Sequence, residues 1–182
     1  MNGKSMHLKN GVKIMIKMLN LDLSISSTGY SIMDENYNLI SYGTIQTTSK
    51  GNTEEERLYI IGKKIDKLIK EFGVNVIVAE NQFKSVNIKT TQQLARLMGI
   101  VIFICKDNNI EIEYFNPSSA RKWVMNNGKA KKEDVAQFIM EKHYNIGEYS
   151  DKQTKKIKKT SDIYDSILLG LAYLKKYKLN NK

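Results

Sequence analysis

The sequence is poor in the residues on which disulfide-rich and zinc-binding domains depend. It contains one cysteine, Cys105, one proline, Pro117, and two histidines, His7 and His143. A single cysteine excludes an internal disulfide, and one Cys with two distant His residues excludes the usual zinc site. Because Cys105 lies in the apolar run GIVIFICKD, we expect a buried structural thiol rather than a nucleophile.

Long hydrophobic runs are absent as well. No stretch of 18 apolar residues occurs, so we expect no membrane span. The first 17 residues are basic but lack the apolar core and the small-residue cleavage site of a signal peptide. We therefore expect a cytosolic protein, with residues 16–180 as one domain. Residues 1–15 are expected to form a basic arm that is either disordered or foreign to the native protein.

Acidic residues are in the minority. The chain has 29 Lys plus Arg against 19 Asp plus Glu, which gives a formal net charge of +10 and an isoelectric point of about 9.5. Basic groups that neutralise phosphates release condensed counterions, so this excess favours a polyanionic partner such as nucleic acid. The alternative is a basic surface that is merely solvated.

The pattern of apolar residues predicts an α/β fold with a mixed sheet. Three strands come first, and capping signals bound the helix that follows: Thr53 and Glu56 form a capping box, and Gly73 ends it. A later helix begins at Asn116-Pro117. The lysine-rich residues 145–160 are expected to be a mobile loop before the last helix, which starts near Thr160 or Ser161. The expected strands are residues 13–24, 29–34, 39–47, 74–80 and 110–115, and the other helices carry residues 94–105 and 131–143.

Four acidic residues stand where a sheet and a helix can bring them together. Asp22 and Glu80 end predicted strands, and ligands of open α/β sheets gather at the carboxyl ends of the strands. Asp162 and Asp165 are three residues apart at the start of the last helix, so they project from nearly the same face. Four unpaired anions repel one another, whereas hard oxygen ligands suit Mg²⁺ or Mn²⁺. Two such ions about 4 Å apart can activate a water for phosphodiester hydrolysis.

Each acid also has an ordinary alternative. Asp22 could cap a turn, and Glu80 could pair with a lysine. Asp162 and Asp165 could be acids of a first helical turn, which the helix dipole favours. The metal cluster accounts for all four together and needs no Ser, His or Cys nucleophile.

Four stretches of the chain are similar to motifs of the RuvC family of Holliday-junction resolvases, and most of all to its phage and viral branch. They are LDLSISSTGYSIMD, VIVAENQF, NGKAKKEDVAQFI and SDIYDSILLGLAYL, and the likeness extends from about Met18 to Tyr177. The resemblance implies an RNase H-like fold, with a mixed sheet of three antiparallel and two parallel strands. It also implies a Mg²⁺-dependent endonuclease that makes paired symmetric nicks in four-way DNA junctions, leaving 5′-phosphate and 3′-hydroxyl ends. Such a protein would act as a homodimer, here through the helix after Thr90, in a bacterial cell and encoded by the cell or by a phage.

The resemblance also assigns residues. The catalytic metal ligands would be Asp22, Glu80, Asp162 and Asp165, holding two Mg²⁺ ions for which Mn²⁺ can substitute. Phe83 would stack on or wedge between bases at the junction centre, unless it is a core aromatic. Lys131 and Lys132 would lie near the scissile phosphate, unless they are only solvated. The full set of expected DNA contacts is Phe83, Lys84, Lys129, Lys131, Lys132, Lys155, Lys156, Lys158 and Lys159.

The chain departs from the bacterial family pattern at two places. Leu23-Ser24 stands where Pro-Gly usually follows the first acid, and Ile163-Tyr164 replaces small residues between the last two acids. Neither change removes a ligand, but both concern the sequence preference at the cut site.

Other functions remain open. The stretch DLSISSTGYSI is also similar to the first phosphate loop of sugar-kinase and actin-like ATPases, but those folds duplicate the domain, and no second loop is seen here, so no nucleotide cofactor is expected. A related nuclease that acts on other branched DNA or on RNA, and a non-catalytic junction-binding protein, fit the same motifs.

Overall fold

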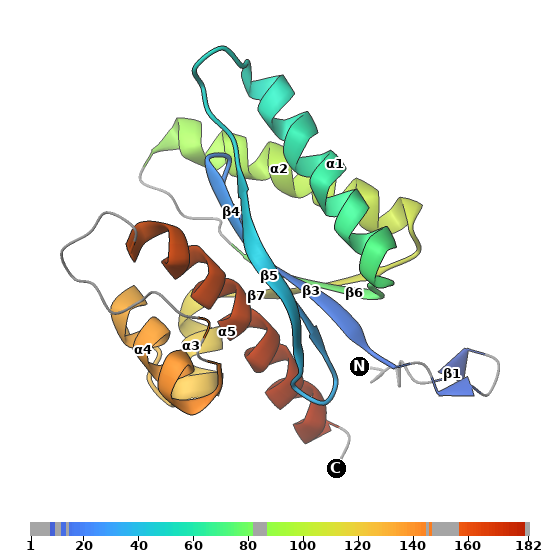
Figure 1. The fold of residues 1–182 in the computed structure, drawn as a ribbon, viewed down its shortest axis with the longest axis vertical. Helices are drawn as coiled ribbons and strands as arrows, with labels where there is room; N and C mark the ends of the chain where they lie inside the picture. The colour runs from blue at the N-terminus through green and yellow to red at the C-terminus, as the bar shows by residue number, and fades with distance from the viewer. Residues whose placement is uncertain are drawn as a thin grey trace.

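The computed structural model describes residues 8–9, 12–13, 15–81, 87–144, 146 and 157–180. Its centre is a five-stranded sheet in the order β5-β4-β3-β6-β7, shown in Figure 1. The first three of these strands are antiparallel neighbours, and β6 and β7 run parallel to β3, so the predicted mixed sheet is confirmed. The bounds are β3 Lys17–Asp22, β4 Ser27–Asp34, β5 Leu39–Gln46, β6 Val76–Glu80 and β7 Glu111–Phe115.

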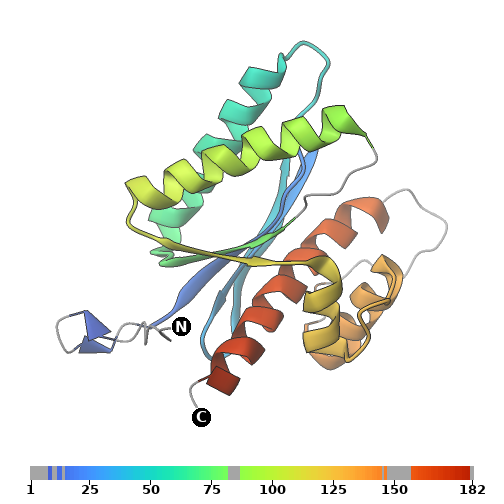
Figure 2. The same cartoon turned by 180° about the vertical axis from the view of Figure 1, so that it is seen from behind.

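Helices cover both faces of the sheet. The first two helices pack on one face and the last three on the other (Figure 2). Because side chains alternate along a strand, β3 serves both layers: Met18 belongs to the core under the last three helices, and Leu19 to the core under the first two. The bounds are α1 Glu54–Phe72, α2 Ile88–Asp107, α3 Pro117–Met125, α4 Lys132–Lys142 and α5 Ile157–Asn180.

The predicted helix boundaries hold where local signals set them. The peptide N–H of Glu56 donates to Thr53 Oγ1 at 3.2 Å, and the Glu56 carboxylate accepts from the Thr53 N–H at 2.6 Å. Gly73 ends α1 in the left-handed conformation, with φ of 63°. Pro117 is the first residue of α3, although the Asn116 side chain makes no capping hydrogen bond.

The start of the last helix differs from the prediction. α5 begins at Ile157, so residues 157–160 of the expected mobile loop are helical. Lysine is a good helix former, and a helix that packs on the sheet can extend into a lysine-rich segment. The rest of that expected loop lies outside the described residues, apart from residue 146.

Two smaller expectations concern the arm and the cysteine. Within residues 1–15 the backbone of β1 (Leu8–Lys9) pairs antiparallel with β2 (Val12–Lys13), apart from the main sheet, and the other residues up to 14 lie outside the description. Cys105 is buried in α2, and burial raises the pKa of its thiol to about 11. The thiol is therefore structural, as predicted.

The sheet topology places the first two acids at one edge. In the parallel register of β3 and β6, Leu21 pairs with Ala79, directly before Asp22 and Glu80. On the other side of β3, Asp22 is opposite Gly29 of β4. A Cβ atom at Gly29 would lie only 2.1 Å from the backbone oxygen of Asp162. The absence of that atom lets α5 rest on the sheet beside Asp22.

Candidate active site

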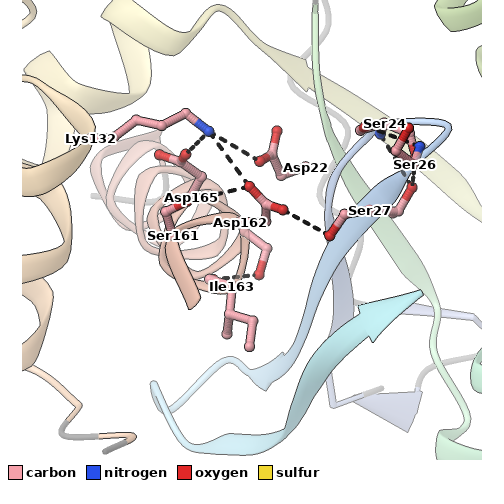
Figure 3. A network of polar contacts seen from close by, with 11 residues as sticks. Asp22, Ser24, Ser26, Ser27, Lys132, Ser161, Asp162, Ile163 and Asp165 are labelled. Carbon is pink, nitrogen blue, oxygen red and sulfur yellow. Dashed lines mark hydrogen bonds and ion pairs between the residues drawn. The ribbon is translucent and has the colours of Figure 1, made fainter. Parts of the chain in front are cut away.

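Three of the predicted acids surround one ammonium group (Figure 3). Lys132 Nζ lies 2.7 Å from Asp165 Oδ2, 3.7 Å from Asp162 Oδ1 and 3.8 Å from Asp22 Oδ2. Lys132 is the first residue of α4, whereas the acids come from β3 and α5. Lys132 therefore pairs directly with the acids, whereas its predicted position near the scissile phosphate stays a prediction.

Electrostatics bring Glu80 into the same group. Burial raises the pKa of Asp22 well above its ordinary value, and the carboxyls of Glu80 and Asp165 raise it further against the opposing effect of Lys132. Burial likewise raises the pKa of Asp165. The residues Asp22 and Asp165 are only 6% and 7% exposed. The four acids thus lie at one site, with Asp22 and Asp165 buried and Glu80 and Asp162 half-buried.

The single positive charge of Lys132 does not neutralise the carboxylates of the cluster. Although burial opposes it, the carboxylates of Asp22 and Asp165 raise the pKa of Lys132 above its ordinary value, so the side chain is an ammonium ion at neutral pH. The pKa of Asp22 nevertheless stays raised with this ammonium in place. One positive charge does not balance the site.

The carboxylate oxygens of the four acids are suitable ligands for a divalent metal, but their present positions do not form a metal site. Across the described ranges, no three Asp, Glu, His or Cys side chains are grouped closely enough to hold a metal ion. The Lys132 ammonium lies among three of the carboxylates, where a cation would be. Carboxylate oxygens are the ligands that Mg²⁺ and Mn²⁺ prefer, and this set already holds one cation. A metal could therefore enter as Lys132 leaves.

Two further residues touch this cluster without having been singled out from the sequence. Ser27 Oγ donates to Asp162 Oδ2 at 2.9 Å and so orients that carboxylate. Arg121 of α3 opposes the raised pKa of Asp165 electrostatically, and among the described residues its buried Nε has no hydrogen-bond partner. The only sequence signal for Arg121 is its place on a helix that follows a strand ending at the same sheet edge.

The acids open into a pocket of about 330 Å³. One wall is the turn between β3 and β4, and another is the start of α2. None of the polar residues of these walls was predicted as a site residue, although the serines lie within the quoted stretch LDLSISSTGYSIMD. The lining comprises Asp22, Leu23, Ser24, Ile25, Ser26, Ser27, Thr90, Gln93, Leu94, Lys132 and Asp162.

The other predicted DNA contacts fall into two groups. Lys129 and Lys131 are exposed beside the start of α4, and the peptide N–H of Lys131 donates to Asp134. For Lys158 and Lys159 only the backbone, in the first turn of α5, is described. The remaining four lie outside the described residues, and they are Phe83, Lys84, Lys155 and Lys156.

One of the two large residues that stand between Asp162 and Asp165, where the bacterial family has small ones, has a structural role. Tyr164 is fully buried in the core under α5, while Asp162 and Asp165 face Lys132. Its ring belongs to the core formed by the sheet and the last three helices.

The fold and the site define a class of protein. A sheet of three antiparallel and two parallel strands, with acids at the ends of β3 and β6 and two more on the closing helix, is an RNase H-like nuclease fold. The chain belongs to the RuvC family, since the family model "Crossover junction endodeoxyribonuclease RuvC" matches residues 18–151. Nucleases of this family are in general metal-dependent. The match ends before α5, so the structure is what brings Asp162 and Asp165 to the site.

Individual proteins agree with the family match. The chain is 31% identical over 165 residues to the crossover junction endodeoxyribonuclease RuvC of Ehrlichia chaffeensis, covering 88% of this chain and 99% of that protein. The structure of Thermus thermophilus RuvC matches with a TM-score of 0.71 at 14% identity, over 91% of this chain and 97% of that one. T. thermophilus RuvC in complex with a Holliday junction substrate matches with a TM-score of 0.69 at 13% identity, over 90% and 96%. The likeness to a phage branch and the cytosolic location stay predictions.

Proposed function

We propose that the chain is a metal-dependent endonuclease that resolves four-way DNA junctions by paired symmetric nicks. The observation that carries this proposal is the convergence of Asp22, Glu80, Asp162 and Asp165 at the carboxyl edge of the sheet, in a chain of the RuvC family. A relative with the same fold was solved with a Holliday junction substrate, which supports the choice of DNA. The net charge of +10 suits the same partner.

Asp22, Glu80, Asp162 and Asp165 would hold Mg²⁺, or Mn²⁺ in its place, as a pair of ions. When bound, such ions activate a water and stabilise the leaving oxygen in phosphodiester hydrolysis. Ser27 holds the Asp162 carboxylate in place. Once displaced from the carboxylates, Lys132 would neutralise part of the charge of the phosphate. The products would carry 5′-phosphate and 3′-hydroxyl ends.

The protein would act as a homodimer through α2. Phe103 is 70% exposed and Ile102 is 39% exposed, on the outer side of this helix. Ala95 and Gly99 follow the same exposed stripe at helical spacing, and their small side chains permit close approach of a second helix. By length and composition alone α2 could even cross a membrane, although packed helices of soluble proteins pass the same test. Only 22% of its most apolar window is buried within the chain, so a second copy is what would cover it.

The test is nicking of a synthetic four-way junction in Mg²⁺, beside a linear duplex, a single strand, a three-way branched DNA and an RNA duplex. We expect paired symmetric nicks on the four-way junction, with 5′-phosphate ends, and loss of nicking in Asp22→Asn and Asp165→Asn. Equal cleavage of the other branched DNA or of RNA would favour a related nuclease of different specificity. Tight junction binding without cleavage in Mg²⁺ or Mn²⁺ would mean a binding protein.

A further inference from the structure

One wall of the pocket beside the acids is built from hydroxyl groups. Ser24 and Ser26 both line the pocket, on the turn that connects β3 to β4 directly after Asp22. Figure 3 shows them close together on this turn, with Ser27 next to them on β4. Ser27 donates to Asp162, whereas Ser24 and Ser26 have no contact with the acids among the described residues. The two hydroxyls therefore have a role other than orienting the carboxylates.

The turn is fixed before any ligand arrives. Thr28 Oγ1 donates to the Ser24 carbonyl oxygen at 2.7 Å and accepts from the Ser24 N–H at 3.2 Å. The Ser26 N–H donates to Ser24 Oγ at 3.3 Å. Because these bonds tie the turn to its own backbone and to β4, the positions of both hydroxyls are set in advance, and little ordering is needed on binding.

The hydrogen bonds of the two hydroxyls leave their protons available. Ser24 Oγ accepts from the Ser26 N–H, and Ser26 Oγ accepts from Arg57 Nη2 at 3.1 Å. A serine hydroxyl has one proton to donate besides its acceptor positions, and within the described part of the chain neither proton has an acceptor. Two donors on one pocket wall call for a ligand rich in acceptor oxygens.

Arg57 adds a positive charge directly behind this wall. The residue is only 8% exposed, and within the described ranges its hydrogen bonds all go to neutral oxygens. Besides Ser26 Oγ, these are Thr47 Oγ1 at 2.9 Å and the Ile25 carbonyl at 3.1 Å. A guanidinium keeps its proton in proteins, so the charge persists at any working pH. A buried cation without a carboxylate partner is costly, and an anion in front of the turn would offset that cost.

We propose that the turn carrying Ser24 and Ser26 binds a phosphate of the DNA strand that neighbours the phosphate being cleaved. Free hydroxyl protons and the Arg57 charge together select phosphate oxygens over the neutral edge of a base. The inference rests on the proposed function, because the strand must enter this pocket to place its scissile phosphate at the acids. The turn would thereby fix the register of the strand at the cut.

Neutral phosphate analogues test this contact without cleavage. The wild-type cut site is mapped first in Mg²⁺, and junctions are then made with one methylphosphonate at each phosphate within two nucleotides of the cut. Binding is measured by fluorescence anisotropy in EDTA. We expect one flanking position at which the neutral group weakens wild-type binding about tenfold, as loss of hydrogen bonds to a charged group does. In the Ser24→Ala/Ser26→Ala variant the methylphosphonate at that position should change binding less than twofold.

The matched control is Thr48→Ala. Thr48 is an exposed hydroxyl that accepts a local backbone N–H, from Lys50, but it does not line the pocket. This variant should keep the full tenfold effect. The single variant Ser26→Ala, at an exposed position, serves if the double variant is unstable, and should lose part of the effect.

Two failures can be told apart. If the methylphosphonate costs the same in the wild type and in both serine variants at every position, the serines do not contact phosphate and the inference is wrong. If the wild type neither binds nor nicks the unmodified junction, the proposed function is wrong, and the subsite fails with it.

Discussion

Asp22 shows at the scale of one residue how a site can work against the stability of its own fold. Its pKa is raised by burial and by Glu80 and Asp165, so ionising it in the folded state costs free energy that ionising it in the unfolded chain does not. Below its ordinary value of 3.8 both states are protonated and the cost is absent. As the pH rises through the raised value, the cost develops fully.

We therefore predict that Asp22→Asn stabilises the metal-free protein at neutral pH. An Asn cannot ionise, so its melting temperature in EDTA at pH 7.5 should exceed that of the wild type by about 2–4 °C, as expected for ~1 kcal/mol in a chain of this size. The difference should shrink toward zero near pH 4. Thermal denaturation of both proteins from pH 4 to 8 measures this difference in melting temperature. The contributions of the other titrating groups cancel in the comparison with the wild type. A lower melting temperature for the variant at neutral pH would contradict the raised pKa.

Lys132 occupies the place among the acids that a metal would take. Its ammonium contacts three carboxylates at 2.7–3.8 Å, so a divalent ion must displace it. We predict that Lys132→Met binds Mn²⁺ about 5- to 10-fold more tightly in the absence of DNA, a coupling of ~1 kcal/mol between the two cations. Its metal-free melting temperature should fall, because partly buried acids lose their counter-ion.

Isothermal titration of Mn²⁺ into protein without DNA measures this competition, so the result does not depend on cleavage. Lys131→Met is the matched control, since Lys131 is the adjacent lysine and makes no ion pair with the acids among the described residues. Its metal affinity should equal that of the wild type. Equal affinity in Lys132→Met would show that the lysine moves aside at no cost.

At the scale of elements, the contact of α5 with β4 decides where the second pair of acids stands. The contact depends on Gly29, where a Cβ would lie 2.1 Å and 2.4 Å from the backbone oxygen and carbon of Asp162. Backbone atoms of a packed helix cannot yield as the tip of a side chain can, so any larger residue must push the helix away.

We predict that Gly29→Ala costs about 1–3 kcal/mol of folding free energy, as overpacking does, and abolishes nicking by moving Asp162. Gly43→Ala is its control in the neighbouring strand, because the added carbon there would meet the hydroxyl oxygen of Tyr30 at 2.9 Å and a side chain can shift. The control should lose less stability and keep its activity. Chemical denaturation and the junction assay measure both, and a fully active Gly29→Ala would show that α5 can adjust without disturbing the site.

The elements also show what the sequence can and cannot foretell. The ends of α1 were predictable because a capping box and a glycine are local signals that act within one turn. Asp22 and Glu80 were predictable because apolar strands end on them. The start of α5 was not, since packing on the sheet stabilises residues that have no apolar period. Likewise Arg57 gave no signal and Arg121 only a weak one, because their positions at the site depend on how helices dock on the sheet.

At the scale of the whole molecule, the site and the exposed surface of α2 lie in different places. The face under α3, α4 and α5 brings Lys132, Asp162 and Asp165 to the acids of the strands, as Figures 1 and 2 show for these helices. The opposite face carries α1 and α2, and α2 in turn exposes Ile102 and Phe103. Among the described residues, α2 lines the pocket with Thr90, Gln93 and Leu94 near its start, whereas Ile102 and Phe103 lie further along the helix. A surface for a second copy can therefore exist at that part of α2 without covering the site.

This separation yields the prediction that Phe103→Asp makes the protein monomeric and still leaves it folded. A charge placed where two copies pack cannot be solvated there, so the dimer should dissociate at micromolar concentration. Light scattering after size-exclusion chromatography measures the mass. Tyr42→Ser is the control, since it removes another exposed aromatic, on β5 away from α2, and should not change the mass.

The monomer should also nick differently. With one site per particle, the two strands of a junction should be cut in separate binding events, so singly nicked junctions accumulate, whereas the wild-type dimer converts them directly to resolved duplexes. A supercoiled cruciform plasmid distinguishes the two, because one nick releases the supercoils and removes the substrate before a second copy can act. The variant should give nicked circles and the wild type linear molecules. If Phe103→Asp stays dimeric and gives linear product, the two copies meet through a surface other than α2. If the variant is a monomer and still gives linear product, pairing of the nicks does not need two copies.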